Sequence, residues 1–133
     1  MFRVNGKEIL MNVFLKFFNL QKKVTLSDAA TTIYMSHSGQ SVGIPADGTT
    51  NREYSIDSSV CAAGNIGAQF TFFNLGTGRL TIDMPAGVKV SDSDAGYQVY
   101  SDTDNIAIIT IELVTATQFL ITGATGTWVT TTA

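Results

Sequence analysis

The chain has 133 residues, of which 44% are hydrophobic and only 14% are charged. This length suits one domain with one core, and the hydrophobic content excludes intrinsic disorder. A net charge of −3 at pH 7 excludes a broad basic surface for nucleic acid. The single cysteine, Cys61, excludes an intrachain disulfide. We expect Cys61 to be a small buried side chain without reactivity, because its nearest basic neighbour in sequence is Arg52.

Residues 1–23 form a chemically distinct N-terminal segment. They carry five basic residues against one acidic residue, a net charge of +4, whereas residues 24–133 carry a net charge of −7. Nine of the twelve residues from 9 to 20 are apolar, and their spacing predicts a short helix that is apolar around most of its circumference. A strand or extended arm is the alternative, because apolar side chains also fall on both alternating sets of residues 13–18.

An apolar segment of this kind must be buried on more than one side. We therefore expect residues 1–23 to dock onto another subunit or another protein, separately from a β domain over residues 24–133. The alternative is that Phe14, Phe17 and Phe18 cap one open end of that domain. The candidate docking residues are Ile9, Val13, Phe14, Phe17, Phe18 and Leu20.

The same apolar run does not have the features of a membrane span or a secretion signal. Lys16 interrupts it, and twelve residues are too few to cross a bilayer. Gln21-Lys22-Lys23 follows it in place of a small-residue cleavage site. We expect a protein that is made in a cytoplasm, stays out of membranes and is delivered by a route other than Sec.

From Val24 onward the pattern predicts β-structure. About nine short strands alternate with turn signals every eight to twelve residues or so, which is typical of an antiparallel β-sandwich of the jelly-roll type. No exact internal repeat is present, which argues against a solenoid. The predicted strands cover residues 32–37, 41–44, 53–60, 69–74, 79–83, 97–100, 106–113, 118–122 and 127–130, with a further strand starting at Val88.

The most regular β pattern lies in residues 67–91. Two runs, 69–74 and 79–83, are joined by Leu75-Gly76-Thr77-Gly78, which predicts a tight hairpin. At least one of Gly76 and Gly78 is then expected to have a positive φ angle.

Residues for catalysis or metal binding are scarce. His37 is the only histidine, and the chain contains no Gly-x-Ser-x-Gly motif, so we predict that the protein is not an enzyme and has no cofactor. The acidic residues of two loops are the one candidate for a cation site, although neither loop matches the twelve-residue calcium loop. Solvated turn residues are the simpler interpretation of Asp92, Asp94, Asp102 and Asp104.

Aromatic side chains offer one further binding hypothesis. Stacking on sugar rings is one use of such residues, whereas aromatic residues in strands more often anchor cores or interfaces. The candidates for a glycan platform are Tyr34, Tyr54, Tyr97, Tyr100 and Trp128.

Residues 24–130 resemble a group of bacteriophage virion domains found in tail fibres, baseplate-associated proteins and head decorations. The similarity lies in the order of several short motifs, each of which is weak alone. In chain order they are Ser27-Asp28-Ala29, Ile44-Pro45-Ala46, the Gly-x-x-Phe-x-Phe-x-Asn-x-Gly-x-Gly run of residues 67–78, Pro85-Ala86-Gly87-Val88, Ile108-Ile109-Thr110-Ile111, residues 117–123 and Trp128. Residues 1–23 have no counterpart in that group.

The resemblance implies a structural protein of a tailed-phage virion that assembles as a homo-oligomer, with a trimer favoured. Its partners would be copies of itself and other virion proteins, and no catalytic residue carries over. The alternative function is a carbohydrate- or receptor-binding module at a fibre tip, which would bind a host surface glycan. An exposed aromatic cleft would favour that module, whereas aromatic residues inside a core or a subunit interface would favour the structural role.

Overall fold

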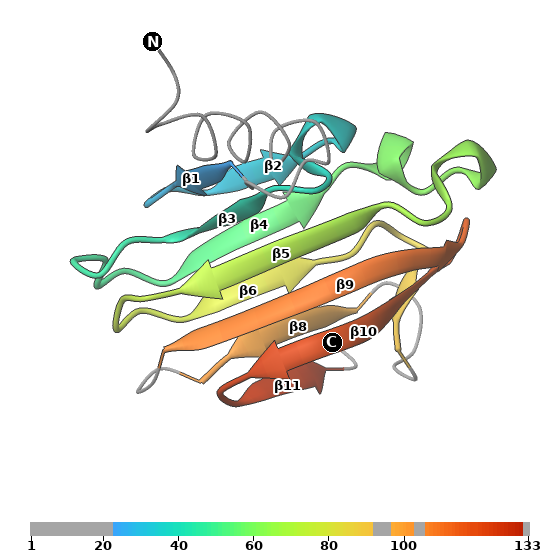
Figure 1. Ribbon diagram of the computed structural model, residues 1–133. Helices are drawn as coiled ribbons and strands as arrows, with labels where there is room; N and C mark the ends of the chain where they lie inside the picture. The colour runs from blue at the N-terminus through green and yellow to red at the C-terminus, as the bar shows by residue number, and fades with distance from the viewer. Residues whose placement is uncertain (1–22, 92–96, 103–105, 132–133) are drawn as a thin grey trace, which may run out of the picture.

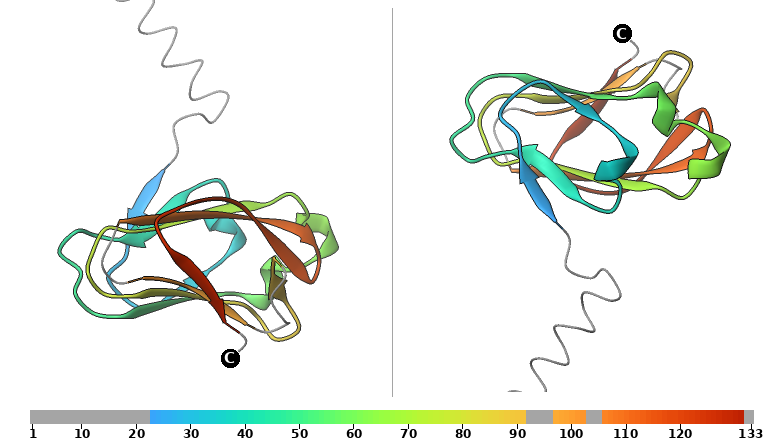
Figure 2. Two further views of the ribbon diagram at one scale, coloured as in Figure 1. Left: turned by 90° about the horizontal axis from the view of Figure 1, so that it is seen from below. Right: turned by 90° about the horizontal axis from the view of Figure 1, so that it is seen from above.

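The computed structural model describes residues 23–91, 97–102 and 106–131, and these residues form eleven strands in two sheets. The two sheets pack face to face, with the six-stranded sheet in front in Figure 1 and both layers visible edge-on in Figure 2. The six-stranded sheet consists, in spatial order, of β1 (Val24–Leu26), β3 (Ser41–Ile44), β5 (Gln69–Asn74), β9 (Ala107–Thr115), β10 (Gln118–Thr125) and β7 (Lys89–Val90). The all-β sandwich predicted from the sequence is confirmed.

The second sheet has five strands. In spatial order they are β11 (Trp128–Thr131), β8 (Gln98–Ser101), β6 (Leu80–Asp83), β4 (Arg52–Ile56) and β2 (Thr31–Ile33). Three short 3₁₀ turns lie outside the sheets, at Met35–His37, Ser58–Val60 and Ala63–Asn65. Two of them shorten the strands predicted over residues 32–37 and 53–60. In the second case the Asp57 carboxylate accepts a hydrogen bond from Ser59 N at 3.1 Å, which caps the turn and ends the extended backbone.

Strand pairing is mixed, which corrects the prediction of a wholly antiparallel, jelly-roll-like arrangement. The first six strands alternate between the two sheets, so neighbours within a sheet are two strands apart in the chain and run in the same direction. Thus β1, β3 and β5 pair in parallel, as do β2, β4 and β6. Antiparallel pairing appears where β5 meets β9 and β6 meets β8.

The first six strands therefore wind through three turns in the manner of a β-solenoid. Each turn passes once through each sheet, and the next turn is stacked beside it. The turns share no exact sequence repeat, which is why the sequence pattern did not indicate this local coil within the sandwich. Stacking needs matching apolar positions and close backbone contact, and both can be met by different residues in each turn.

The core fills the space between the two sheets. Its largest fully buried side chains include Tyr54 of β4, Phe70 and Phe72 of β5, and Phe119 of β10. Tyr54 and Phe72 meet edge to face with ring centroids 6.2 Å apart, as do Phe70 and Phe119. These contacts join the two sheets and the two halves of the chain into one core.

The predicted hairpin over residues 69–83 is wrong. β5 and β6 lie in different sheets, so the linker of residues 75–79 crosses between layers. Neither Gly76 nor Gly78 has a positive φ angle; among described glycines that angle occurs at Gly39, Gly67, Gly87 and Gly126.

Glycine is needed in this linker for space. A Cβ atom at Gly76 would lie 2.2 Å from the carbonyl oxygen of Gly48, and one at Gly78 would lie 2.2 Å from that of Thr50. Gly48 and Thr50 belong to the linker between β3 and β4, which crosses between the sheets beside residues 75–79. The glycines thus allow two consecutive turns of the coil to stack backbone against backbone.

Candidate functional site

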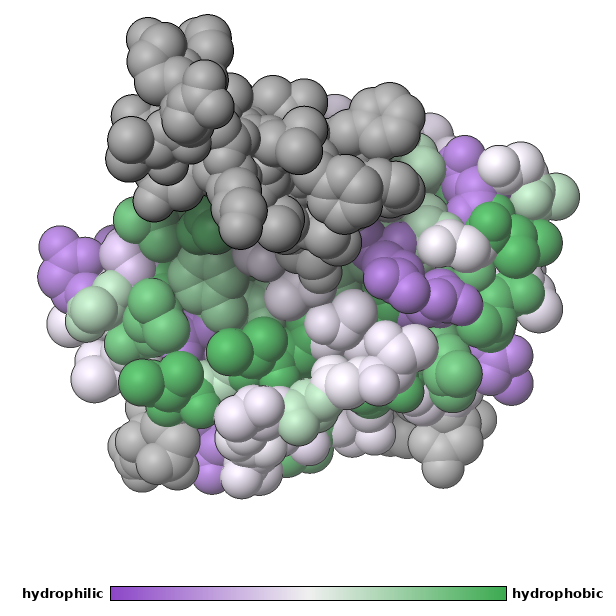
Figure 3. All heavy atoms as spheres, in the orientation of Figure 1, coloured by the Kyte–Doolittle hydropathy of each residue, from purple (hydrophilic) through white to green (hydrophobic). Residues whose placement is uncertain are grey.

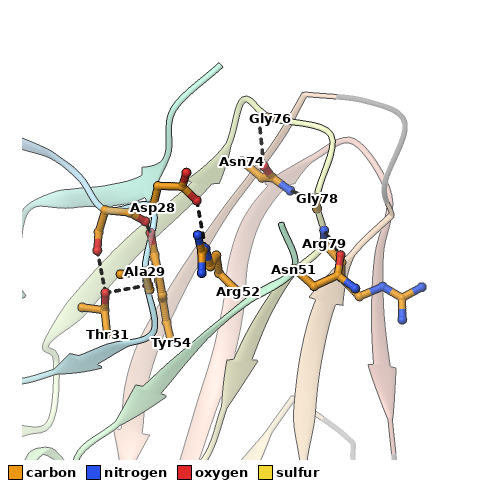
Figure 4. A network of polar contacts seen from close by, with 11 residues as sticks. Asp28, Ala29, Thr31, Asn51, Arg52, Tyr54, Asn74, Gly76, Gly78 and Arg79 are labelled. Atoms are coloured by element: carbon orange, nitrogen blue, oxygen red, sulfur yellow. Dashed lines mark hydrogen bonds and ion pairs between the residues drawn. The ribbon is translucent and has the colours of Figure 1, made fainter. Parts of the chain in front are cut away.

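Polar side chains brace the end of the sandwich where the linkers cross between sheets (Figure 4). Asn74, which is fully buried, donates from Nδ2 to Gly78 O at 2.7 Å and to Ser101 Oγ at 3.0 Å. Its Oδ1 accepts from Gly76 N at 3.0 Å. Asn74 therefore joins the linker of residues 75–79 to Ser101 at the end of β8, and both of its side-chain polar atoms have hydrogen-bond partners.

The first turn of the coil is fastened to the second in a similar way. Asp28 Oδ1 and Arg52 Nε form an ion pair at 2.9 Å, and Figure 4 shows the two side chains pointing toward each other. The Tyr54 hydroxyl donates to Ser27 O at 2.7 Å. Burial raises the pKa of Tyr54 from 10.0 to about 12. Asp28, Arg52 and Tyr54 thus make structural contacts between the first two turns of the coil.

His37 has a local role in the structure. Its Nδ1 accepts a hydrogen bond from Tyr34 N at 3.0 Å, and its ring stacks on Tyr34 with centroids 6.4 Å apart. Cys61 is half-buried and packs against the core, as the sequence led us to expect, although it is not fully enclosed. Burial raises the pKa of its thiol, and the nearby Asp57 carboxylate raises it further.

The hypothesis of a cation site falls largely outside the described residues. Asp92, Asp94 and Asp104 lie there, while Asp102 is described and exposed, with its backbone N donating to Thr127 O at 3.0 Å. Within the described ranges, no three His, Cys, Asp or Glu residues are grouped so that they could hold a metal ion. The described part also contains no helix long and apolar enough to cross a membrane.

The candidate docking residues of the N-terminal segment lie outside the described residues as well. They are Ile9, Val13, Phe14, Phe17, Phe18 and Leu20. The predicted helix and the boundary at residue 23 stay predictions.

The aromatic candidates for a glycan platform are dispersed. Tyr54 is fully buried in the core, whereas Tyr34 is exposed and directly precedes the 3₁₀ turn Met35–His37. Trp128 is half-buried, and its Nε1 donates to the carbonyl oxygens of Ile108 and Thr125. The Tyr100 ring is half-buried, and the Arg79 guanidinium carbon lies 4.3 Å from its centroid. Tyr97 is also half-buried. The structure does not bring these side chains together into one cleft.

The most distinctive surface is the outer face of the six-stranded sheet. Strand register places Leu26 of β1 beside Gly43 of β3, Gly43 beside Phe73 of β5, and Phe73 beside Ile108 of β9. Alternation along each strand turns these residues away from the core, because their neighbours Val42, Phe72 and Ile109 are buried inside it. An apolar row therefore crosses four adjacent strands.

The row is open to solvent at its two ends, whereas Gly43 and Phe73 between them are buried. Leu26 is 60% exposed and Ile108 is 40% exposed, whereas Phe73 is buried with its ring over the Gly43 backbone. Leu75 and Ile106 extend the row at the strand ends and are also exposed. Figure 3 shows hydrophobic residues in green over the left part of this face and also at its right edge. We refer to Leu26, Phe73, Leu75, Ile106 and Ile108 as the apolar row.

The rest of this face is mixed, because Val24 of β1 and Leu120 of β10 are also exposed on it, and the opposite face is more polar. Farther along the six-stranded sheet, Gln69 Nε2 donates to Glu112 Oε1 at 2.7 Å, and the hydroxyls of Thr71 and Thr110 lie 3.0 Å apart. The outer face of the five-stranded sheet carries mostly polar side chains, with Val129 its one exposed large hydrophobic residue among those described. The polar side chains on this outer face include Glu53, Ser55, Thr81, Asp83 and Gln98. The apolar row thus makes one face of the sandwich different from the other.

Sequence reasoning did not find the apolar row, because its members are far apart in the chain. Comparison with protein-family models, curated proteins and solved structures found no match for this chain. The functional proposal therefore rests mainly on the geometry of the described residues, above all on the apolar row.

Proposed function

We propose that this chain is a non-enzymatic structural protein that assembles as a homo-oligomer through the outer face of its six-stranded sheet. The observation that carries the proposal is the apolar row, whose counterpart on the five-stranded sheet is polar. Contiguous apolar side chains on one face of a small domain mark a contact surface. The proposal requires no catalytic residue, cofactor, nucleic acid or membrane.

The energetic gain from covering the row is substantial for a domain of this size. Leu26 and Ile106 are 60% and 61% exposed, and Ile108 is 40% exposed. Burying the exposed parts of these three side chains is worth roughly 3 kcal/mol per copy at the usual transfer energies. No described charged side chain occupies the row itself, so its burial does not require removing a charge from water.

The biological setting that we propose is the virion of a tailed bacteriophage. Its support is the order of motifs over residues 24–130 described above, together with the low charge content of 14%. In this setting the chain is a decoration, fibre or tail component, is favoured as a trimer, and contacts other virion proteins.

The glycan-binding alternative has less support, because the aromatic side chains are dispersed. A screen of the full chain against immobilised glycans tests it, with Tyr34→Ala as the variant because Tyr34 is the most exposed of the five candidate aromatic residues. Glycan binding that Tyr34→Ala abolishes would support the alternative.

The proposed function is tested by the mass of the full chain in solution. Multi-angle light scattering at micromolar concentration should give a homo-oligomer, with three copies as the favoured value. A stable monomer under these conditions would contradict the proposal.

A further inference from the structure

We propose that the apolar row of one copy receives residues 9–20 of a neighbouring copy, so that the N-terminal segment joins subunits. The inference rests on the proposed function and names the partner of the apolar row. Two parts of the chain have apolar side chains that need a partner: the apolar row on the six-stranded sheet, and residues 9–20 of the N-terminal segment.

The chain passes from the N-terminal segment directly into the strand at one end of the row. The segment leads into Val24 at the start of β1, and β1 is the edge strand that contributes Leu26 to the row. From β1 to β9 the row crosses three strand spacings, about 14 Å at about 4.8 Å each. Twelve residues as the predicted helix extend about 18 Å, which is enough to lie along the whole row.

The composition of the segment requires more than one covering surface. Ile9, Val13 and Phe17 fall on one stripe of the predicted helix, and Phe14 and Phe18 fall on the stripe beside it. A single sheet face covers one side of a helix and leaves the other side in water. A segment that leaves its own subunit and lies on the row of a neighbour can be enclosed between the two copies.

Charge favours the same arrangement. The segment carries a net charge of +4, and residues 24–133 carry −7. Asp47 is exposed in the linker that follows β3, at the end of the sandwich where Leu75 extends the row, whereas Asp28 at the same end is already paired with Arg52. A lysine of the segment, Lys16 or Lys22, would come near the Asp47 carboxylate when the apolar side chains cover the row.

Disulfide cross-linking between two differently tagged full-length chains tests the inference. Both chains carry Cys61→Ala, which removes the native thiol. One chain has a single cysteine in the segment, placed in turn at Ile9, Val13, Phe14 and Phe17, and the other has Ile108→Cys in the row. The chains are co-expressed, and mild oxidation should give a covalent dimer that contains both tags for at least one segment position.

The matched control replaces Ile108→Cys by Ser55→Cys, which lies on the outer face of the opposite sheet. Cross-linking to Ser55→Cys should be lost. Equal cross-linking to both faces would overturn the inference, because contact would then be random.

Two other outcomes separate the inference from the function on which it rests. A single chain can also carry both cysteines, one in the segment and one at position 108. If that chain closes an internal disulfide while the mixed chains do not cross-link, the segment covers the row of its own subunit, and the inference is overturned. An oligomer that forms no cross-link at any of the four segment positions also overturns it and leaves the proposed function standing. A monomeric wild-type chain contradicts both.

Discussion

Replacing Gly78 by alanine tests the explanation given for the crossing between the two sheets. The added Cβ atom would lie 2.2 Å from Thr50 O and 2.5 Å from Thr50 C, both of them backbone atoms. Ordinary contact begins near 3.4 Å, so one of the stacked linkers must move by about 1 Å. That movement strains the hydrogen bonds from Asn74 Nδ2 to Gly78 O at 2.7 Å and from Arg79 N to Asn51 Oδ1 at 2.8 Å.

The expected loss is about 2–4 kcal/mol in the free energy of unfolding. Overpacking contributes about 1–3 kcal/mol, and weakening one or two hydrogen bonds contributes about 1 kcal/mol more. Urea denaturation measures this loss as a lower midpoint with an unchanged slope.

Two further glycines separate crowding from backbone strain. Gly64 has open space where an added Cβ atom would lie and no positive φ angle, so Gly64→Ala should change stability by less than about 0.5 kcal/mol. Gly87 has equal space but a φ angle of 81°, so Gly87→Ala should cost about 1 kcal/mol through strain alone. If Gly78→Ala is no more destabilising than Gly64→Ala, the stacked-linker explanation is refuted.

Two more predictions concern buried polar side chains, and a third concerns the N-terminal segment. Asn74→Ala should lower the free energy of unfolding by about 2–4 kcal/mol in urea titrations, because it leaves Gly76 N and Gly78 O without their side-chain partner and removes one of two hydrogen bonds to Ser101 Oγ; a loss under about 1 kcal/mol would contradict this. Tyr54 has a pKa raised from 10.0 to about 12, so the folded state holds its proton more tightly and stability should fall by up to about 3 kcal/mol as the pH rises from 10 to 12. Tyr54→Phe should remove that part of the pH dependence, and an unchanged pH profile would refute the assignment. Deleting residues 1–23 should leave a folded β-sandwich by circular dichroism that no longer assembles, and a truncated chain that unfolds or assembles normally would defeat the docking role of the segment.

The β content could be predicted from the sequence because it depends on local patterns. The run of residues 69–74 became β5, and residues 41–44 became β3, because alternation and turn signals are visible within a few residues. The strand that follows β5 could not be placed from the same information. A two-glycine linker suits a hairpin, and it also suits a crossing between sheets, where Gly76 and Gly78 are needed for contact with a linker about thirty residues earlier.

The candidate site could not be predicted because it joins distant parts of the chain. Leu26, Phe73 and Ile108 become neighbours only through the register of four strands, which pair in parallel from β1 to β5 because the coil returns to the same sheet. Phe73 gave a signal that could have been used. It follows Phe72 directly, and since adjacent residues of a strand face opposite sides, one of these two rings had to lie on the outer face.

The central claim is that the apolar row is the contact between subunits, and the mass of one variant in solution tests it most directly. Ile108→Lys places a charge at the β9 end of the row, and Ser55→Lys places the same charge on the opposite outer face as the matched control. By multi-angle light scattering, Ile108→Lys should be a folded monomer, while Ser55→Lys should retain the mass of the wild-type oligomer. An Ile108→Lys chain that assembles like the wild type would contradict the claim.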